Sequence, residues 1–204
     1  MLRFVGLCVL SFLFFSVLAL AQVSPNIADS GVNRSGKNPL QIALLHWYNA
    51  NLTTTIPVGP NPQGAAFDGA NIWTASWSDN TVTKVRANDC TVLGSFSVGA
   101  KAFSLAFDGA NIWVTTGGNQ VTKLRASDGT VLGTFTVGVS PAGIAFDGAN
   151  MWVSAGDGTV TKLRAADGKL MGKFTIGGSA VFGVAFDGAN IWVANYASSS
   201  LSKF

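Results

Sequence analysis

One heptapeptide recurs along the chain and constrains its fold more than any other feature. Phe-Asp-Gly-Ala-Asn-Ile-Trp begins at Phe67, Phe107 and Phe186, and at Phe146 with Met151 in place of Ile, so the copies lie 40, 39 and 40 residues apart. A fixed period of about 20 to 50 residues is typical of proteins that stack one supersecondary unit. The sequence therefore predicts a repeat protein, and the content of one period decides its fold.

The third period has the pattern of four short β-strands separated by turns. Its β-rich runs are Gly143 to Phe146, Met151 to Ser154, Thr159 to Arg164 and Leu170 to Ile176, which we call strands a, b, c and d. Asp-Gly pairs in the a–b and c–d turns favour tight hairpins, because glycine adopts a positive φ freely and Asp bonds to nearby amides. A four-stranded antiparallel unit of about 40 residues, repeated around an axis, describes a β-propeller blade.

We therefore expect an all-β fold, a β-propeller with four blades over residues 52–204. The blades are predicted at about 60–98, 99–137, 138–176 and 177–204. The last period stops after strand c, whereas Thr54 to Gly59 aligns with the d strands, so residues 52–58 are expected to act as a closing strand. Two alternatives stay open: a closed four-bladed ring, or a fragment of a larger propeller, which is slightly favoured because such regular blades usually belong to larger rings.

The N-terminal residues have the pattern of a cleaved export signal over 1–21: Arg3, an apolar run, and Ala19-Leu20-Ala21. Residues 22–51 are predicted to form a polar arm followed by a short amphipathic helix that begins near Pro39. The mature protein is therefore expected to be secreted or periplasmic, without membrane attachment after signal cleavage.

Composition argues against several classes of function. The net charge is +3 and only 11% of residues are charged, which is too weak a field for nucleic-acid binding. All ten acidic residues are aspartates, and His46 is the one histidine. We therefore predict no catalytic residues, no metal site and no cofactor. After signal cleavage Cys90 remains, as an exposed free thiol in a c–d turn.

Positions that are identical in all repeats are those that the blade itself requires. The tryptophans of strand b are predicted to form the core between blades: Trp73, Trp113, Trp152 and Trp192. The aspartates of the a–b turns are predicted to cap those turns: Asp68, Asp108, Asp147 and Asp187. Strand c carries a basic set that we expect to be solvated and offset by Asp89, Asp128 and Asp167: Lys84, Arg86, Lys123, Arg125, Lys162, Arg164 and Lys203.

Positions that vary between repeats gather at one end of the blades. Because neighbouring strands run in opposite directions, the b–c and d–a loops share a face, and their sequences differ strongly. Aromatic and polar residues in these loops are the candidate ligand-binding set: Trp77, Asp79, Lys101, Phe103, Asp157, Asn195 and Tyr196. Such a mixture suits a shallow site for an unknown small molecule, a glycan or a protein. Neutral drift of a solvent-exposed face explains the same variation.

The repeats resemble the NHL and YVTN propeller families and, among enzymes, the virginiamycin B (streptogramin) lyase group. The resemblance rests on the Ala-Phe-Asp-Gly runs, on Ile191-Trp-Val-Ala-Asn-Tyr196, and on Val-Thr-Lys-Leu-Arg at 121–125 and 160–164. It implies a propeller fold. The lyase group depends on histidine, glutamate and magnesium near the central opening, and this chain offers no matching residues to carry over.

The sequence thus favours a non-enzymatic secreted binding module that presents a variable loop face. One alternative is a lyase or lactonase whose catalytic blades are missing or altered, so enzymatic activity stays open but is not favoured. Another is a structural cell-surface repeat protein, which would self-associate.

Overall fold

The computed structural model describes residues 55–176 and 181–204. The predicted signal, arm and helix at residues 1–51, and the first three residues of the predicted closing strand, lie outside the described residues. No helix in the described part of the chain could span a membrane.

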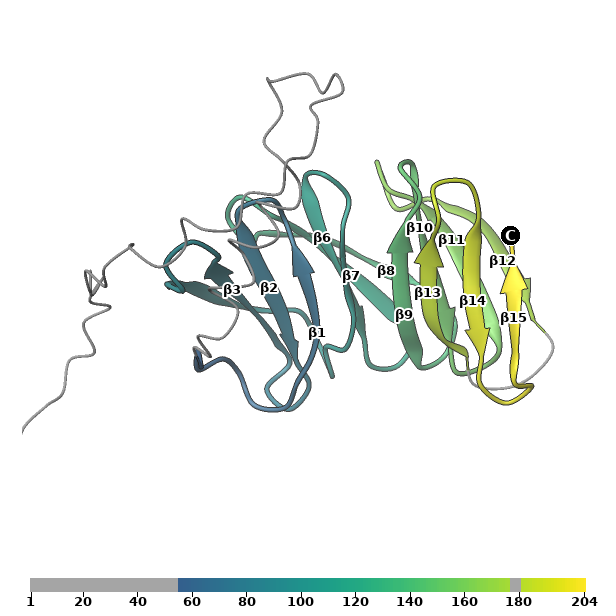
Figure 1. Ribbon diagram of the computed structural model, residues 1–204, viewed down its shortest axis with the longest axis horizontal. Helices are drawn as coiled ribbons and strands as arrows, with labels where there is room; N and C mark the ends of the chain where they lie inside the picture. Colours follow the sequence, from purple (N-terminus) through teal and green to yellow (C-terminus); the bar gives the residue numbers. More distant parts are fainter. Residues whose placement is uncertain (1–54, 177–180) are drawn as a thin grey trace, which may run out of the picture. The chain divides into compact units, whose positions relative to one another are not determined.

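Four antiparallel sheets follow one another along the chain, each in meander order (Figure 1). We refer to them as blades 1 to 4. Blade 1 comprises β1 (Pro62–Phe67), β2 (Asn71–Ser76), β3 (Thr81–Arg86) and β4 (Val92–Ser97). Blade 2 comprises β5 (Leu105–Phe107), β6 (Asn111–Thr116), β7 (Gln120–Arg125) and β8 (Val131–Thr136). Blade 3 comprises β9 (Pro141–Phe146), β10 (Asn150–Ala155), β11 (Thr159–Arg164) and β12 (Leu170–Thr175). Blade 4 comprises β13 (Val181–Phe186), β14 (Ile191–Asn195) and β15 (Ser200–Lys203).

The blades share one strand register. Trp73 pairs with Lys84, Trp113 with Lys123, Trp152 with Lys162, and Trp192 with Lys203. Directly paired residues point to the same side of a sheet. Each blade therefore has a front face, which carries the Trp and Lys of strands b and c, and a back face, which carries the residues that alternate with them.

The front face of one blade packs against the back face of the next. Trp73 and Val82 of blade 1 form a core with Ile112, Val114 and Leu124 of blade 2. Equivalent cores join blade 2 to blade 3 and blade 3 to blade 4. The prediction that the strand-b tryptophans form the core between blades is confirmed for the first three, which are buried, whereas Trp192 on the front face of blade 4 is only partly buried.

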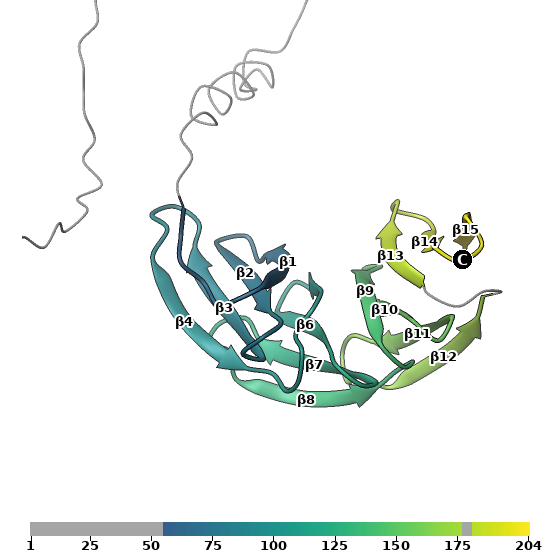
Figure 2. The same ribbon diagram turned by 90° about the horizontal axis from the view of Figure 1, so that it is seen from below.

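The sheets stand along an arc that is not closed (Figure 2). Their first strands β1, β5, β9 and β13 contact one another in that order. The all-β propeller prediction is confirmed in the form of a partial propeller. The described residues do not form a ring closed by the N-terminal strand. Residues 55–58 lie outside any strand, and the sheet of blade 4 consists of β13, β14 and β15. Four blades in this arc leave the two end faces apart.

The aspartate of each a–b turn ties the turn to the core. Asp108 Oδ1 accepts hydrogen bonds from the backbone N–H groups of Ala110 and Asn111, at 2.9 and 2.7 Å. Its other oxygen, Oδ2, accepts a bond from the buried indole Nε1–H of Trp113, at 2.7 Å. The same bonds recur at Asp68, Asp147 and Asp187. These aspartates therefore cap the turns as predicted, and they also satisfy the indole donors of the core.

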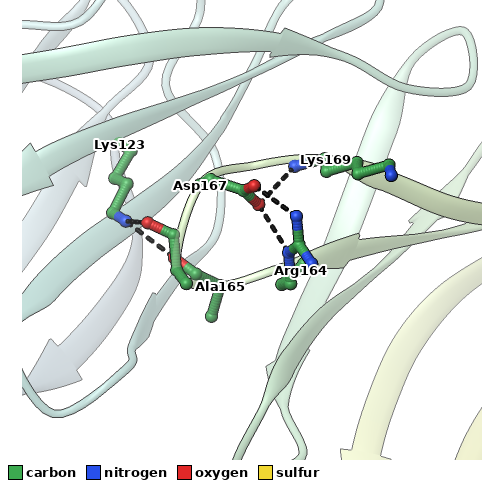
Figure 3. Close-up of polar contacts among 6 residues, drawn as sticks. Lys123, Arg164, Ala165, Asp167 and Lys169 are labelled. Carbon is green, nitrogen blue, oxygen red and sulfur yellow. Dashed lines mark hydrogen bonds and ion pairs between the residues drawn. The ribbon is translucent and has the colours of Figure 1, made fainter.

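The basic set of strand c divides into two groups, and the prediction of solvated cations was wrong for two lysines. Lys84 and Lys123 are only 7% and 6% exposed. Lys123 Nζ donates to the carbonyl oxygens of Ala165 and Ala166 in the c–d turn of the next blade, at 2.7 and 3.2 Å (Figure 3). It also lies 4.9 Å from the ring centroid of Trp113. Packing against the following blade, which one repeat cannot reveal, encloses these side chains.

The arginines behave as expected. Arg86 and Arg125 each lie 2.9 Å from the aspartate three residues later, Asp89 and Asp128, with both partners about half exposed. Arg164 makes the equivalent pair with Asp167, which Figure 3 shows beside the lysine contact. Exposed pairs of this kind contribute little to stability. These arginine pairs also lie within one c–d turn and do not cross between blades. Neighbouring blades are joined by the apolar cores and by the buried lysines.

Candidate functional site

The b–c and d–a loops surround a small cavity. Its volume is about 250 Å³, which is slightly below the range of about 300–1,000 Å³ that is usual for small-molecule sites. All four blades, with the loops between them, contribute to its wall: Trp77, Lys101, Phe103, Gly117, Gly118, Ser140, Pro141, Ala142 and Phe182. Three of the seven residues proposed from the sequence thus come together: Trp77 from the b–c loop of blade 1, and Lys101 and Phe103 from the d–a loop before β5.

Trp77 and Phe103 form an aromatic corner with a cation beside it. Their ring centroids are 5.8 Å apart, and the rings meet edge to face at 75°. Lys101 Nζ lies 5.3 Å from the centroid of the Trp77 ring, within the range of a cation–π contact. Trp77 remains 38% exposed, so part of its ring is open to a ligand. The corner therefore offers an apolar surface with one positive charge at its side.

The loop backbone fixes the position of the lysine. Lys101 has a φ of 51°, in the left-handed region that costs most residues free energy. Its N–H donates to Asn80 Oδ1 at 2.6 Å. Asn61 and Ser140 occupy the same place in the other d–a loops, with φ values of 50° and 57°. The repeat therefore imposes the loop conformation, while the side chain at this place is free to differ.

The two aromatic residues are anchored by the backbone as well. The N–H of Trp77 donates to the carbonyl of Asn61 at 3.1 Å, which links the b–c loop of blade 1 to the loop before β1. The N–H of Phe103 donates to the carbonyl of Thr115 at 2.9 Å. Both rings are thus carried on backbone that is bonded to neighbouring segments, which favours a preformed site.

Sequence reasoning left Phe182 and the glycines out of the candidate set. Phe182 occupies the place in its repeat that Phe103 occupies in the second, so aligning the repeats could have identified it. Gly117 lies so close to the lysine loop that an added Cβ would stand 3.0 Å from Lys101 Cβ. A larger residue at position 117 would require the loop that carries Lys101 to shift by a few tenths of an ångström.

Asn195 and Tyr196 lie beside the cavity rather than in it. They line a more open hollow at blade 4, of about 600 Å³, which shares Phe182 with the cavity. The Tyr196 and Phe182 rings meet edge to face, with centroids 5.5 Å apart. The Asn195 amide donates to Ser200 and Ser202, whereas its buried Oδ1 has no hydrogen-bond partner in the part of the chain that is described.

Asp79 and Asp157 do not line the cavity: Asp79 bonds within its own turn, and Asp157 bonds within its turn and to the preceding d–a loop. Asp79 Oδ1 accepts a hydrogen bond from Thr81 at 2.9 Å. Asp157 accepts bonds from the hydroxyl of Thr159 at 2.6 Å and from the N–H of Val139 at 2.9 Å. Burial opposes ionisation of Asp157, but these hydrogen bonds outweigh it and lower its pKa. Both carboxylates therefore shape the loops.

The arrangement is suited to binding. Within residues 55–176 and 181–204, no three His, Cys, Asp or Glu side chains are grouped to hold a metal ion. What the cavity presents is aromatic surface, backbone groups of glycine and serine, and one ammonium group. Such a set can hold an apolar or ring-shaped group and attract a negative charge.

Comparison with known proteins reveals structural relatives only. No protein-family model matches the chain, and no curated protein sequence matches it. Among solved structures, hydrazine synthase of Kuenenia stuttgartiensis matches with a TM-score of 0.65 at 18% identity, over 74% of this chain and 48% of that one. BamB from Moraxella catarrhalis matches with a TM-score of 0.61 at 11% identity, over 68% of this chain and 41% of that one.

The computationally designed Ika4 protein is similar as well, with a TM-score of 0.65 at 13% identity, over 75% of this chain and 98% of that one. The chain thus spans about half the length of several structures that it matches, and nearly all of the designed one. At these identities the likeness establishes the fold alone. The chain has a β-propeller-like fold of four antiparallel sheets.

Proposed function

We propose that the chain is a secreted, non-enzymatic binding module whose ligand enters the cavity formed by the b–c and d–a loops. The observation that carries this proposal is the convergence of Trp77, Lys101 and Phe103 on one cavity. Trp77 lies in the b–c loop of blade 1, whereas Lys101 and Phe103 share the d–a loop before β5, and the blade itself requires these residues in neither loop.

The chemistry of the cavity favours a ring-shaped ligand that carries an anionic group, such as an acidic sugar within a glycan. The Trp77 ring offers a flat, partly exposed surface, and aromatic side chains combine large contact area with fixed geometry. Lys101 adds one cation at the side of that ring. A neutral ligand would use the aromatic corner but leave the ammonium group without a partner.

The propeller family and the cellular location that we propose rest on the repeats and on the N-terminal sequence pattern. The Phe-Asp-Gly-Ala-Asn-Ile-Trp repeats support membership of the NHL or YVTN propeller group, and the pattern of residues 1–21 supports export to the cell exterior or periplasm. The loop-face cavity favours binding over the lyase or lactonase alternative, because it presents aromatic rings and one cation rather than paired acid and base groups.

A glycan array followed by calorimetry tests this proposal. We expect acidic oligosaccharides to bind and their neutral counterparts to bind at least tenfold more weakly. Trp77→Ala should reduce the affinity about tenfold or more, in line with the loss of a central aromatic contact. Lys101→Asn should remove the preference for acidic ligands while keeping the loop, because Asn61 occupies the equivalent position at nearly the same φ.

Tyr196→Ala is the matched control, since Tyr196 is 74% exposed and lies outside the cavity. Its affinity should equal that of the unmodified protein. Binding that is unaffected by Trp77→Ala and Lys101→Asn would place the ligand elsewhere, and an array without any hit would remove acidic glycans from consideration.

A further inference from the structure

The two ends of the arc expose the two halves of one interface. On the front face of blade 4, Leu201 is 66% exposed, whereas the equivalent Val82, Val121 and Val160 are each 0% exposed. On the back face of blade 1, Ile72 is 37% exposed. Its equivalent in blade 2, Ile112, is fully buried. Among residues 55–176 and 181–204, the front face of blade 4 and the back face of blade 1 are thus the faces without a neighbouring blade, although Val85 on the latter is only 4% exposed.

The internal interfaces show what each face is built to contact. At all three, a front face with the Trp and Val of strands b and c meets the Ile or Met and the Val of strand b of the next blade. A Leu of strand c completes the first two back faces, and Phe204 stands at this place in the third. At the first two, a front-face lysine also bonds to carbonyls of the next c–d turn. Lys203 lies 5.4 Å from the Trp192 ring centroid, in the same pose as Lys84 over Trp73. A front face of this kind therefore fits the back face of blade 1.

Residues 55–58 already lie against that back face. Ile56 and Val58 line a hollow of about 530 Å³ together with Ile72, Val85 and Cys90. In sequence, Ile56 aligns with Phe96 of β4, and Val58 aligns with Val98, which follows β4. Phe96 and Val98 pack on the back face of blade 2. The segment thus stands where the strand d of a preceding blade would stand, although no described residue supplies strands a to c of that blade.

The residue at position 90 supports this placement. An added Cβ at Gly129 would stand 2.1 Å from Phe96, and at Gly168 it would stand 1.9 Å from Phe135. These glycines are therefore required by the phenylalanine of the preceding strand d. At the equivalent place of blade 1 the chain has Cys90, and the residue that faces it from residues 55–58 is the smaller Ile56. Where strand d has a Phe, the facing turn has a Gly, and where residues 55–58 have the smaller Ile56, the facing turn has the larger Cys90. Such a paired change of size is expected for two residues that pack together.

We propose that a second copy of the chain closes this structure head to tail. The front face of blade 4 in one copy packs against the back face of blade 1 in the other, and residues 55–58 of that other copy add to the free edge of β15 as the missing strand d. Lys203 then donates to the carbonyls of Ala87 and Asn88, as Lys84 does to those of Ala126 and Ser127. Two such contacts between different surfaces close a pair into one ring.

The open edge of blade 4 also supports a second copy as the occupant. The exposed strand edge of β15 favours strand addition, which is the usual way that an unpaired edge is satisfied. The competing arrangements are one copy that closes on itself, which the open arc does not favour, and a larger ring built from further blades of the same kind.

Light scattering on the purified full-length chain tests the proposal, because it measures mass in solution. We expect twice the mass of one chain at concentrations of tens of micromolar. Leu201→Asp should give single copies, since it places a charge in the contact while changing a side chain that is 66% exposed within one copy. Leu170→Asp is the matched control, as Leu170 is 56% exposed on the outer strand β12, and it should remain paired. Circular dichroism should show that both variants keep their β-structure.

Mixing two variants tests the head-to-tail geometry. Ile72→Asp damages the back face and Leu201→Asp damages the front face, so each alone should give single copies. A mixture retains one intact contact, the front face of the first on the back face of the second, and should form pairs. Single copies of the unmodified chain, pairing that survives Leu201→Asp, assemblies that grow with concentration, or a mixture that fails to pair would each overturn the proposal.

Discussion

At the scale of the residue, the aspartate of the a–b turn bonds both to its own turn and to the core of the blade. Asp108 accepts bonds from two backbone amides, from the Asn111 side chain and from the Trp113 indole. Burial opposes its ionisation, but these hydrogen bonds outweigh it, so its pKa in the folded protein is lowered. One carboxylate thus determines both the shape of a turn and the orientation of a core tryptophan.

We predict that Asp108→Asn lowers the free energy of unfolding at pH 7 by about 1–3 kcal/mol, because the amide group cannot accept all of these bonds. A lowered folded-state pKa stabilises the protein above the unfolded pKa of about 4, and the stabilisation is lost as the pH falls through the folded value. The difference from the unmodified protein should therefore narrow below pH 4. Urea titrations at pH 7 and pH 3 check this, and an equal difference at both would contradict it.

At the scale of the element, the lysine of strand c connects one sheet to the next. We predict that Lys123→Met lowers the free energy of unfolding by about 1–3 kcal/mol, because two enclosed carbonyls of the next c–d turn lose their donor. Lys162→Met is the control: Lys162 lies in the same pose over Trp152, but its Nζ makes no hydrogen bond among the described residues. Urea unfolding of both variants measures the difference, and equal losses would show that the carbonyl bonds are not the cause.

The strands could be predicted from the sequence, and the contacts between blades could not. Strand c of the third repeat was predicted at Thr159 to Arg164, which are the bounds of β11, because Gly and Asp-Gly signals mark both ends. The lysines were misjudged because alternation along one strand gives the face on which a side chain lies, whereas its burial depends on the next blade. The candidate site was predicted only in part for the same reason. Trp77 meets Lys101 and Phe103 across the boundary between two blades, whereas Asp79 and Asp157 accept hydrogen bonds within the loops and do not line the cavity.

At the scale of the whole molecule, stability should vary along the arc. In an array of repeats each unit is stabilised mainly by its neighbours. Blade 2 has neighbours on both faces, whereas the front face of blade 4 is open. In the Leu201→Asp variant, we predict that the amides of β6 and β7 exchange with solvent at least tenfold more slowly than those of β14 and β15. Hydrogen exchange with mass spectrometry measures this, and uniform protection would show that the end face is covered within one copy.

The shared build of the interfaces has a consequence for how such a gene can change. Every junction joins the same kind of front face to the same kind of back face, and the faces at the two ends are of these same kinds. An in-frame duplication of one 39- or 40-residue repeat therefore adds a junction, and a loss removes one, without altering either end. The number of blades can change through recombination between repeats that share the Phe-Asp-Gly-Ala-Asn segment, and the loops can diversify one blade at a time.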